Sequence, residues 1–137
     1  MRKEFEILPH MADLKIRAYG KDLSELFAHA LKGMFMSIQP QVTPGSGAVQ
    51  RPFGVASHDR ASLLVDFLSH ALCLSDTYGE AYLDATIESL TETYIKGVFH
   101  GVRVDDFGEG EIKAVTHHDL KLEQQDGAWV AEILFDI

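Results

Sequence analysis

The chain has 137 residues, of which 46% are hydrophobic, so it is long enough for one packed domain and too short for two enzymatic domains. It carries 21 acidic and 12 basic side chains, and its formal net charge of −9 argues against nucleic-acid binding through a dominant basic surface. The acid is concentrated late in the chain: residues 1–75 carry 8 basic and 7 acidic groups, while residues 76–137 carry 4 and 14. We interpret most of this excess as a solvated acidic face; the alternatives are a cation site and a docking surface for a basic partner.

The only cysteine is Cys73, so no disulfide can form within the chain, and a reducing compartment is consistent with that. The first residues are charged and lack the apolar stretch of a secretory signal. No apolar run approaches the roughly 20 residues that span a bilayer. We therefore expect a cytoplasmic, soluble protein with no membrane attachment, and a single domain over residues 1–137.

The first predicted elements are a strand and a helix. Apolar and charged residues alternate from Ala12 to Gly20, which indicates a half-buried strand. Asp22 is a candidate N-cap, with Glu25 three residues later. Apolar residues then recur at helical spacing from Leu23 to Ile38 and predict an amphipathic core helix.

The next segment, residues 39–54, contains three prolines and three glycines, which predicts a loop insertion with a short strand near its end. A second amphipathic helix is expected from about Asp59 to Ser75.

The remainder of the chain is rich in β-branched and aromatic residues with alternating polarity. Asp126-Gly127 is a strong signal for a hairpin turn. The predicted strands cover Thr86–Leu90, Thr93–Gly101, Ile112–Glu123 and Ala128–Phe135. The expected fold class is α+β, with two amphipathic helices packed on a mainly antiparallel β-sheet.

The sequence lacks the residue motifs of several common enzyme classes. The chain has no phosphate-binding P-loop and no Gly-x-Ser-x-Gly nucleophile motif, and Cys73 is expected to be a buried thiol. His117 and His118 are neighbours in a predicted strand and would point to opposite faces. We expect His29 and His58 to be solvated, which disfavours a zinc centre built from histidines.

Carboxylates at the two ends of the chain form a better constellation. Asp13 begins the first predicted strand, Asp136 follows the last one, and Ile137 carries the terminal carboxylate. Together they would offer the hard oxygen ligands that Ca²⁺ or Mg²⁺ prefers. The alternative is that each carboxylate merely ends a strand in solvent, because the sequence does not show whether the two ends meet.

Four motifs together resemble the archease family. PHMADLKIRAYG at residues 9–20 resembles the H-T-A-D-x-x-I-x-A-x-G signature, and IKAVTHH at residues 112–118 resembles the family's x-K-A-V-T-Y-H strand. GAW at residues 127–129 and FDI at residues 135–137 resemble the G-x-W hairpin and the F-D-I terminus. Order and spacing agree over essentially the whole chain. The chain departs from the family pattern at Pro9, Met11, Ser69-His70 and His117.

The resemblance implies a protein cofactor, itself not an enzyme, for the tRNA-splicing RNA ligase that joins 2′,3′-cyclic phosphate and 5′-hydroxyl RNA ends. Such a protein promotes guanylylation of the ligase and its multiple turnover. The resemblance also implies a metal site, usually calcium, at Asp13, Asp136 and Ile137, and a role in activation for Lys113. Two other readings stay open: a chaperone-like binding module for another RNA-processing enzyme such as a tRNA methyltransferase, and a metal-dependent hydrolase with His10 as general base.

Overall fold

The computed structural model describes residues 3–8, 13–108 and 110–137. All pairings between its strands are antiparallel. The elements in chain order are β1 (Phe5–Leu8), β2 (Leu14–Gly20), α1 (Leu23–Ser37), β3 (Pro40–Val42), β4 (Ala48–Ala56), α2 (Arg60–Tyr78), β5 (Glu80–Leu90), β6 (Tyr94–Phe107), β7 (Ala114–Gln125) and β8 (Ala128–Asp136). In the described part of the chain, no helix is long and apolar enough to cross a bilayer.

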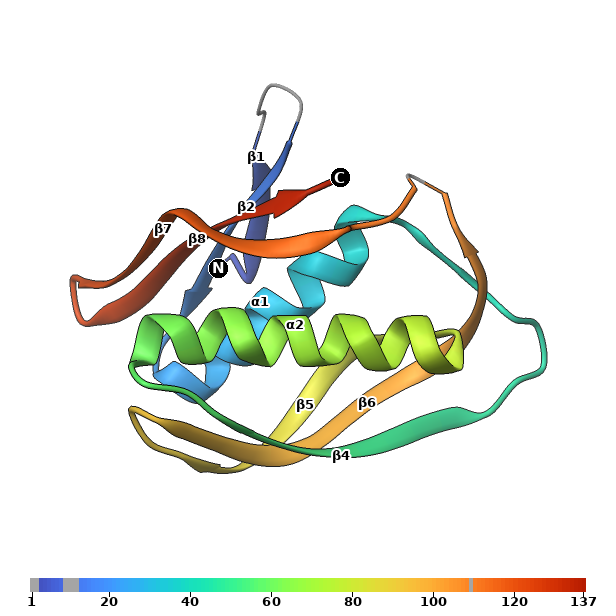
Figure 1. Ribbon diagram of the computed structural model, residues 1–137, viewed down its shortest axis with the longest axis horizontal. Coiled ribbons are helices and arrows are strands. Elements are labelled where there is room, and N and C mark those ends of the chain that lie inside the picture. The colour runs from blue at the N-terminus through green and yellow to red at the C-terminus, as the bar shows by residue number, and fades with distance from the viewer. Residues whose placement is uncertain (1–2, 9–12, 109) are drawn as a thin grey trace.

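The strands form two sheets, and the helices lie between them (Figure 1). One sheet has the order β1-β2-β8-β7, and in the other β6 pairs with β3, β4 and β5. Helix α1 contacts β1 and β2 on one side and β5 on the other, while α2 contacts β7 and β4. The predicted α+β fold with two helices on an antiparallel sheet is confirmed, with the strands divided between two sheets that enclose the helices.

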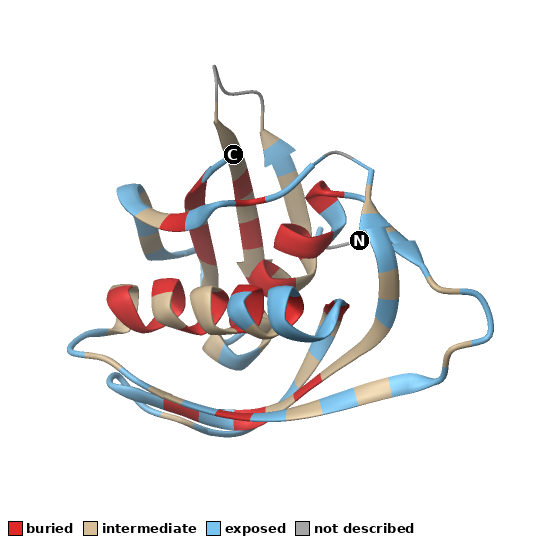
Figure 2. Ribbon diagram, turned by 45° about the vertical axis from the view of Figure 1, so that its right-hand side comes forward, coloured by how far each residue is buried: buried red, intermediate tan, exposed pale blue. Residues whose placement is uncertain are grey.

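Aromatic side chains join α2 to the sheet formed by β3, β4, β5 and β6, which we call the lower sheet. The Phe99 ring of β6 lies 4.2 Å from Phe53 of β4, 5.3 Å from Tyr82 of β5 and 5.5 Å from Phe67 of α2, measured between ring centroids. All four side chains are buried. Figure 2 shows the same arrangement for the molecule as a whole, with buried residues on the helices and on the strands that cover them.

Both helices begin at the predicted aspartates. The Asp22 carboxylate accepts from the Glu25 backbone N–H at 2.8 Å, and the Asp59 carboxylate accepts from the Ser62 N–H at 2.7 Å. Helix α2 continues three residues beyond the predicted end and stops at Gly79, whose φ of 68° is the left-handed conformation that glycine adopts readily.

Replacing Asp59 with Ala is expected to lower the thermal unfolding midpoint by about 3 °C, because the α2 N-terminus loses its cap. Hydrogen bonds from Ser62 lower the pKa of Asp59 in the folded protein. This contribution is therefore complete above the ordinary pKa of 3.8 and is lost as the pH falls through the folded value. Thermal melts at pH 7 and pH 3 measure both effects. Asp59→Asn serves as the control, since asparagine also caps; an equal loss in both variants would contradict the capping role.

The loop predicted at residues 39–54 is wrong over most of its length, whereas the short strand expected near its end is present as part of β4. Strand β3 and most of β4 lie within it, and only residues 43–47 form a connecting turn. Both strands pair with β6, β3 along residues 104–107 and β4 along residues 94–102. Pro52 is tolerated because β4, which pairs only with β6 among the described strands, is an edge strand, and sheets accept proline at their edges.

Strand boundaries differ in three further places. Strand β1 was not predicted, and β5 begins at Glu80, six residues before the predicted start at Thr86. Strand β6 extends to Phe107. Strand β7 is continuous from Ala114 to Gln125, but its pairing with β8 shifts register between Thr116 and Lys121, an irregularity that was not predicted.

Candidate functional site

The two ends of the chain meet in the sheet with the order β1-β2-β8-β7, which we call the upper sheet. There β2 and β8 are adjacent antiparallel strands. Leu14 pairs with Phe135, so the same register continued by one residue places Asp13 opposite Asp136. Neighbouring strands lie roughly 4.8 Å apart. This long-range pairing is the feature that the sequence could not establish.

Strand β7 completes the group on the other side of β8. Ala114 pairs with Asp136, and the Lys113 backbone N–H donates to the Asp136 carbonyl at 2.7 Å. The register therefore places Lys113 opposite Ile137. Four residues singled out from the sequence lie at one end of three adjacent strands, and we call this group the carboxylate tip: Asp13, Lys113, Asp136 and Ile137.

The carboxylate tip is accessible and its C-terminal part is anchored. Phe135 is fully buried, which fixes the end of β8 to the core. Asp136 alternates with Phe135 and is exposed, and Ile137 is 51% exposed. The Lys113 side chain is exposed as well, whereas Asp13 is half-buried. A partner can therefore reach the carboxylates and the ammonium without any rearrangement of the core.

A groove between α2 and β7 adjoins the carboxylate tip. It measures about 370 Å³ and is lined by Lys113, Asp76 and Cys73, among others. Cys73 is exposed, so the expectation of a buried thiol is wrong: it lies on the side of α2 that faces this groove rather than the core.

The carboxylate tip fits a hard cation by its chemistry. The register brings two aspartates and the terminal carboxylate to neighbouring positions, and all three offer oxygen ligands. Across residues 3–8, 13–108 and 110–137, no three His, Cys, Asp or Glu side chains cluster at metal-binding spacing. At the carboxylate tip, the terminal carboxylate of Ile137 is the third oxygen donor beside the two aspartates. His10, with Pro9 and Met11, lies outside the described residues.

The histidines are arranged differently from the expectation. His117 and His118 are both exposed where β7 loses its register, so the prediction from regular strand alternation does not apply to them. His29 is half-buried, and its Nδ1–H donates to the Tyr19 carbonyl at 2.6 Å, since a carbonyl can only accept. The expectation that His29 is solvated is wrong. His58 is 82% exposed, as predicted.

A buried ion pair was not predicted at all. The Glu80 carboxylate is 2% exposed and accepts from Arg51 at 2.9 and 2.8 Å and from the Tyr82 hydroxyl at 2.7 Å. The Arg51 guanidinium also lies 3.7 Å from the centre of the Tyr78 ring. The hydrogen bonds from Arg51 lower the pKa of Glu80. The pKa of Tyr82 is raised mainly by burial and secondly by its hydrogen bond to Glu80. These contacts hold β4, β5 and the end of α2 together.

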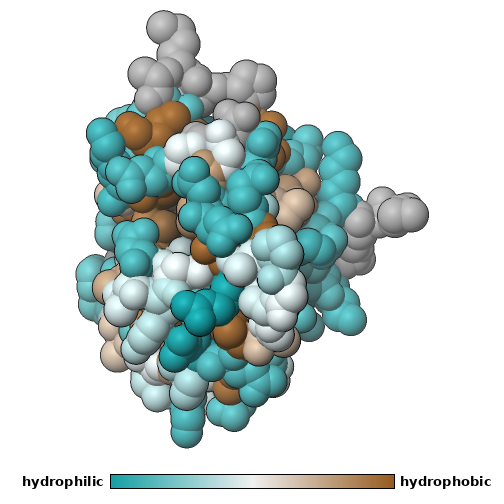
Figure 3. All heavy atoms as spheres, turned by 90° about the vertical axis from the view of Figure 1, so that its right-hand side faces the viewer, coloured by the Kyte–Doolittle hydropathy of each residue, from teal (hydrophilic) through white to brown (hydrophobic). Residues whose placement is uncertain are grey.

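The acidic surface is largely solvated, as interpreted from the sequence. Hydrophilic side chains cover most of the face in Figure 3, which is the right-hand side of Figure 1, where β6 ends. Asp105 and Asp106 at the end of β6 and Glu111 in the following connection are exposed. Such a surface suits contact with a basic partner.

Fold and site together define a small α+β protein with an exposed, charged tip at the end of one sheet. The chain matches the model of the Archease protein family (MTH1598/TM1083) over residues 5–137. It is 34% identical to protein archease of Methanosarcina mazei, covering 98% of this chain and 97% of the relative, and 32% identical to that of Pyrococcus abyssi, covering 98% and 99%. The chain belongs to the archease family.

Two solved structures share the fold. The solution structure of Methanobacterium thermoautotrophicum protein 1598 has a TM-score of 0.76 at 29% identity, covering 98% of this chain and 99% of that one. The crystal structure of an archease, described as a possible chaperone, from Thermotoga maritima has a TM-score of 0.65 at 20% identity, covering 100% and 98%. The second similarity is at the level of the fold alone.

Proposed function

We propose that this archease activates the tRNA-splicing RNA ligase that joins 2′,3′-cyclic phosphate or 3′-phosphate ends to 5′-hydroxyl ends of RNA. It promotes guanylylation of the ligase and repeated turnover, and carries out no ligation itself. The observation that carries the proposal is the register of β2, β8 and β7, which gathers the four residues of the carboxylate tip in a member of the archease family.

Asp13, Asp136 and the terminal carboxylate of Ile137 hold calcium or a similar hard cation such as magnesium in this proposal. When bound, the cation supplies positive charge that offsets the repulsion among the three carboxylates and ties the two chain ends together. The carboxylates then act as a rigid unit rather than as separate strand ends.

Lys113 provides the basic group of the carboxylate tip. Its backbone is held by the hydrogen bond to Asp136, while its ammonium group is free to extend into solvent because the side chain is exposed. A lysine ammonium is a mobile point charge that binds phosphate oxygens or carboxylates. We assign it the contact that aligns a phosphate or acidic group at the nucleotide site of the ligase.

The charge distribution supports a protein partner rather than direct RNA binding. The second half of the chain carries 14 acidic and 4 basic residues, which repels RNA and attracts a basic RNA-processing enzyme. The ligase therefore contacts the RNA, and the archease contacts the ligase, in the cytoplasm.

A chaperone-like module for another RNA-processing enzyme, such as a tRNA methyltransferase, is the second candidate. The description of the Thermotoga maritima relative as a possible chaperone favours it. Affinity capture from lysate followed by mass spectrometry separates the two candidates, because the ligase is the main captured protein only in the first.

Lys113→Ala is expected to reduce activation of the cognate ligase at least about tenfold, because the ammonium group that contacts the ligase is lost. The measurement is guanylylation of purified ligase with GTP, and product formed per ligase, with and without the archease. Lys121→Ala is the matched control, since Lys121 is an exposed lysine of β7, the strand that directly follows Lys113, and lies outside the carboxylate tip. Equal ligase rates with and without the archease would contradict the function, and a fully active Lys113 variant would contradict the role of this residue.

A further inference from the structure

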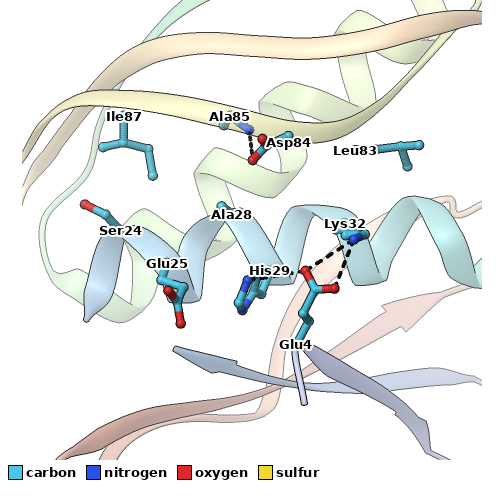
Figure 4. Close-up of a pocket in the computed structure, with 10 residues that line it drawn as sticks. All are labelled: Glu4, Ser24, Glu25, Ala28, His29, Lys32, Leu83, Asp84, Ala85 and Ile87. Atoms are coloured by element: carbon cyan, nitrogen blue, oxygen red, sulfur yellow. Dashed lines mark hydrogen bonds and ion pairs between the residues drawn. The ribbon is translucent and has the colours of Figure 1, made fainter. Parts of the chain in front are cut away.

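A second and larger groove lies beside α1, away from the carboxylate tip. It measures about 650 Å³ and runs between α1 and β5 (Figure 4). His29 in its lining contacts Tyr19 near the end of β2, whereas Asp13 precedes the start of β2. Six residue steps along a strand correspond to roughly 20 Å. The groove is therefore a separate surface, and its role extends beyond the proposed function of the carboxylate tip.

The wall of this groove is an open sheet edge. Strand β5 pairs with β6 on one side and, among the described strands, has no partner on the other. The Ala85 backbone N–H is instead covered by the neighbouring Asp84 carboxylate at 2.8 Å. An open edge of this kind can accept another extended chain through backbone hydrogen bonds.

The other sheet edges are less suited to accept a strand. Strand β4 contains Pro52, which has no N–H, and β7 loses its register between Thr116 and Lys121. Strand β1 has only four residues. Strand β5 has eleven residues, and the groove lies directly against it.

The lining combines apolar and acidic groups. Leu83 and Ile87 project from β5 toward the groove, and the small side chain of Ala28 on α1 leaves space opposite them (Figure 4). The lining carries three carboxylates, Glu4, Glu25 and Asp84, against one lysine, and that lysine, Lys32, is bound to Glu4 at 3.0 Å. The groove is therefore net acidic.

We propose that the edge of β5 accepts an extended, basic segment of a partner protein as an additional strand. Its apolar side chains pack on Leu83, Ile87 and Ala28. Its backbone carbonyl takes the Ala85 N–H from Asp84, and the released carboxylate, with Glu25, pairs with the basic side chains of the segment. Backbone hydrogen bonds supply affinity, and the alternating apolar and basic positions supply specificity.

The test uses the full chain and an octapeptide that alternates valine and lysine. Nuclear magnetic resonance titration is expected to shift the amide signals of residues 83–87 and to slow hydrogen exchange of the Ala85 amide. A valine–glutamate octapeptide is expected to bind at least about tenfold more weakly, because its glutamates are repelled by the carboxylates of the groove, whereas the lysines of the first peptide pair with them. Shifts confined to another strand edge, or equal binding of the two peptides, would overturn the proposal.

Two variants, each with a matched control, distinguish binding in the groove from general attraction between the basic peptide and the acidic protein. Ala28→Gln fills the space opposite Leu83 and is expected to weaken binding about tenfold, whereas Ala61→Gln, the same change on α2 outside the groove, is expected to leave it unchanged. Asp84→Asn, which can still accept from Ala85, is expected to weaken binding of the lysine peptide more than Glu88→Gln on the same strand. Unchanged affinity of the Ala28 variant, with its fold verified by circular dichroism, would place the peptide elsewhere.

Discussion

Replacing Arg51 with Ala is expected to lower the thermal unfolding midpoint by roughly 10 °C. The substitution leaves the buried Glu80 carboxylate with the Tyr82 hydroxyl as its remaining side-chain partner in the described structure. It also removes the guanidinium from the face of the Tyr78 ring. Because Arg51 itself is 33% exposed, the effect comes mainly from the uncompensated charge of Glu80.

The pH dependence identifies that charge. Arg51 lowers the pKa of Glu80 in the folded protein, so the stability from this pair is fully present above the ordinary value of 4.5 and is lost as the pH falls through the folded pKa. The difference in melting temperature between the unsubstituted protein and the Arg51→Ala variant is thus expected to narrow below about pH 4. Adding Glu80→Gln to Arg51→Ala should recover part of the loss. If the double variant is less stable than Arg51→Ala alone, the buried charge is not the cause.

Asp136→Asn is expected to reduce ligase activation at least about tenfold and to remove calcium binding in isothermal titration calorimetry, since the amide is a weaker ligand than the carboxylate. Its effect on stability should be small, because the Asp136 side chain is exposed and its contact with Lys113 uses the backbone. Asp13→Asn is expected to have the same effect on calcium binding and on ligase activation.

Asp126→Asn is the matched control for these variants. Asp126 lies in the turn at the opposite end of β8 with a φ of 51°, which asparagine also tolerates. It should leave both calcium binding and activation unchanged. An Asp136 variant that activates the ligase normally after losing calcium would show that the cation is not required.

Local sequence patterns correctly predicted helix α1 and the β7–β8 hairpin, whose conformations depend mainly on neighbouring residues. The apolar spacing after Leu23 predicted α1 to within one residue, and the Asp126-Gly127 signal placed the β7–β8 hairpin, where both residues have positive φ. Strand β3 and the full length of β4 were missed because proline and glycine favour turns locally, whereas both strands are stabilised by pairing with β6, some 50 residues later.

The start of β5 was missed for a related reason. Glu80 is an acidic residue at a buried strand position, and only the distant Arg51 makes that position favourable. At the carboxylate tip, residue chemistry selected Asp13 and Asp136 as candidate ligands. Their proximity depends on the pairing of β2 with β8, which no local pattern encodes.

The position of β8 between β2 and β7 also constrains how the protein folds during synthesis. Strands β1 and β2 can form a hairpin early, yet the open edge of β2 must wait for residues 129–135, which follow β2 by about 110 residues. The upper sheet is therefore completed only after both helices and β3 to β7 have been synthesised. Until then the side of α1 that packs on β1 and β2 has only an incomplete sheet to cover it, so its apolar residues stay accessible on the growing chain.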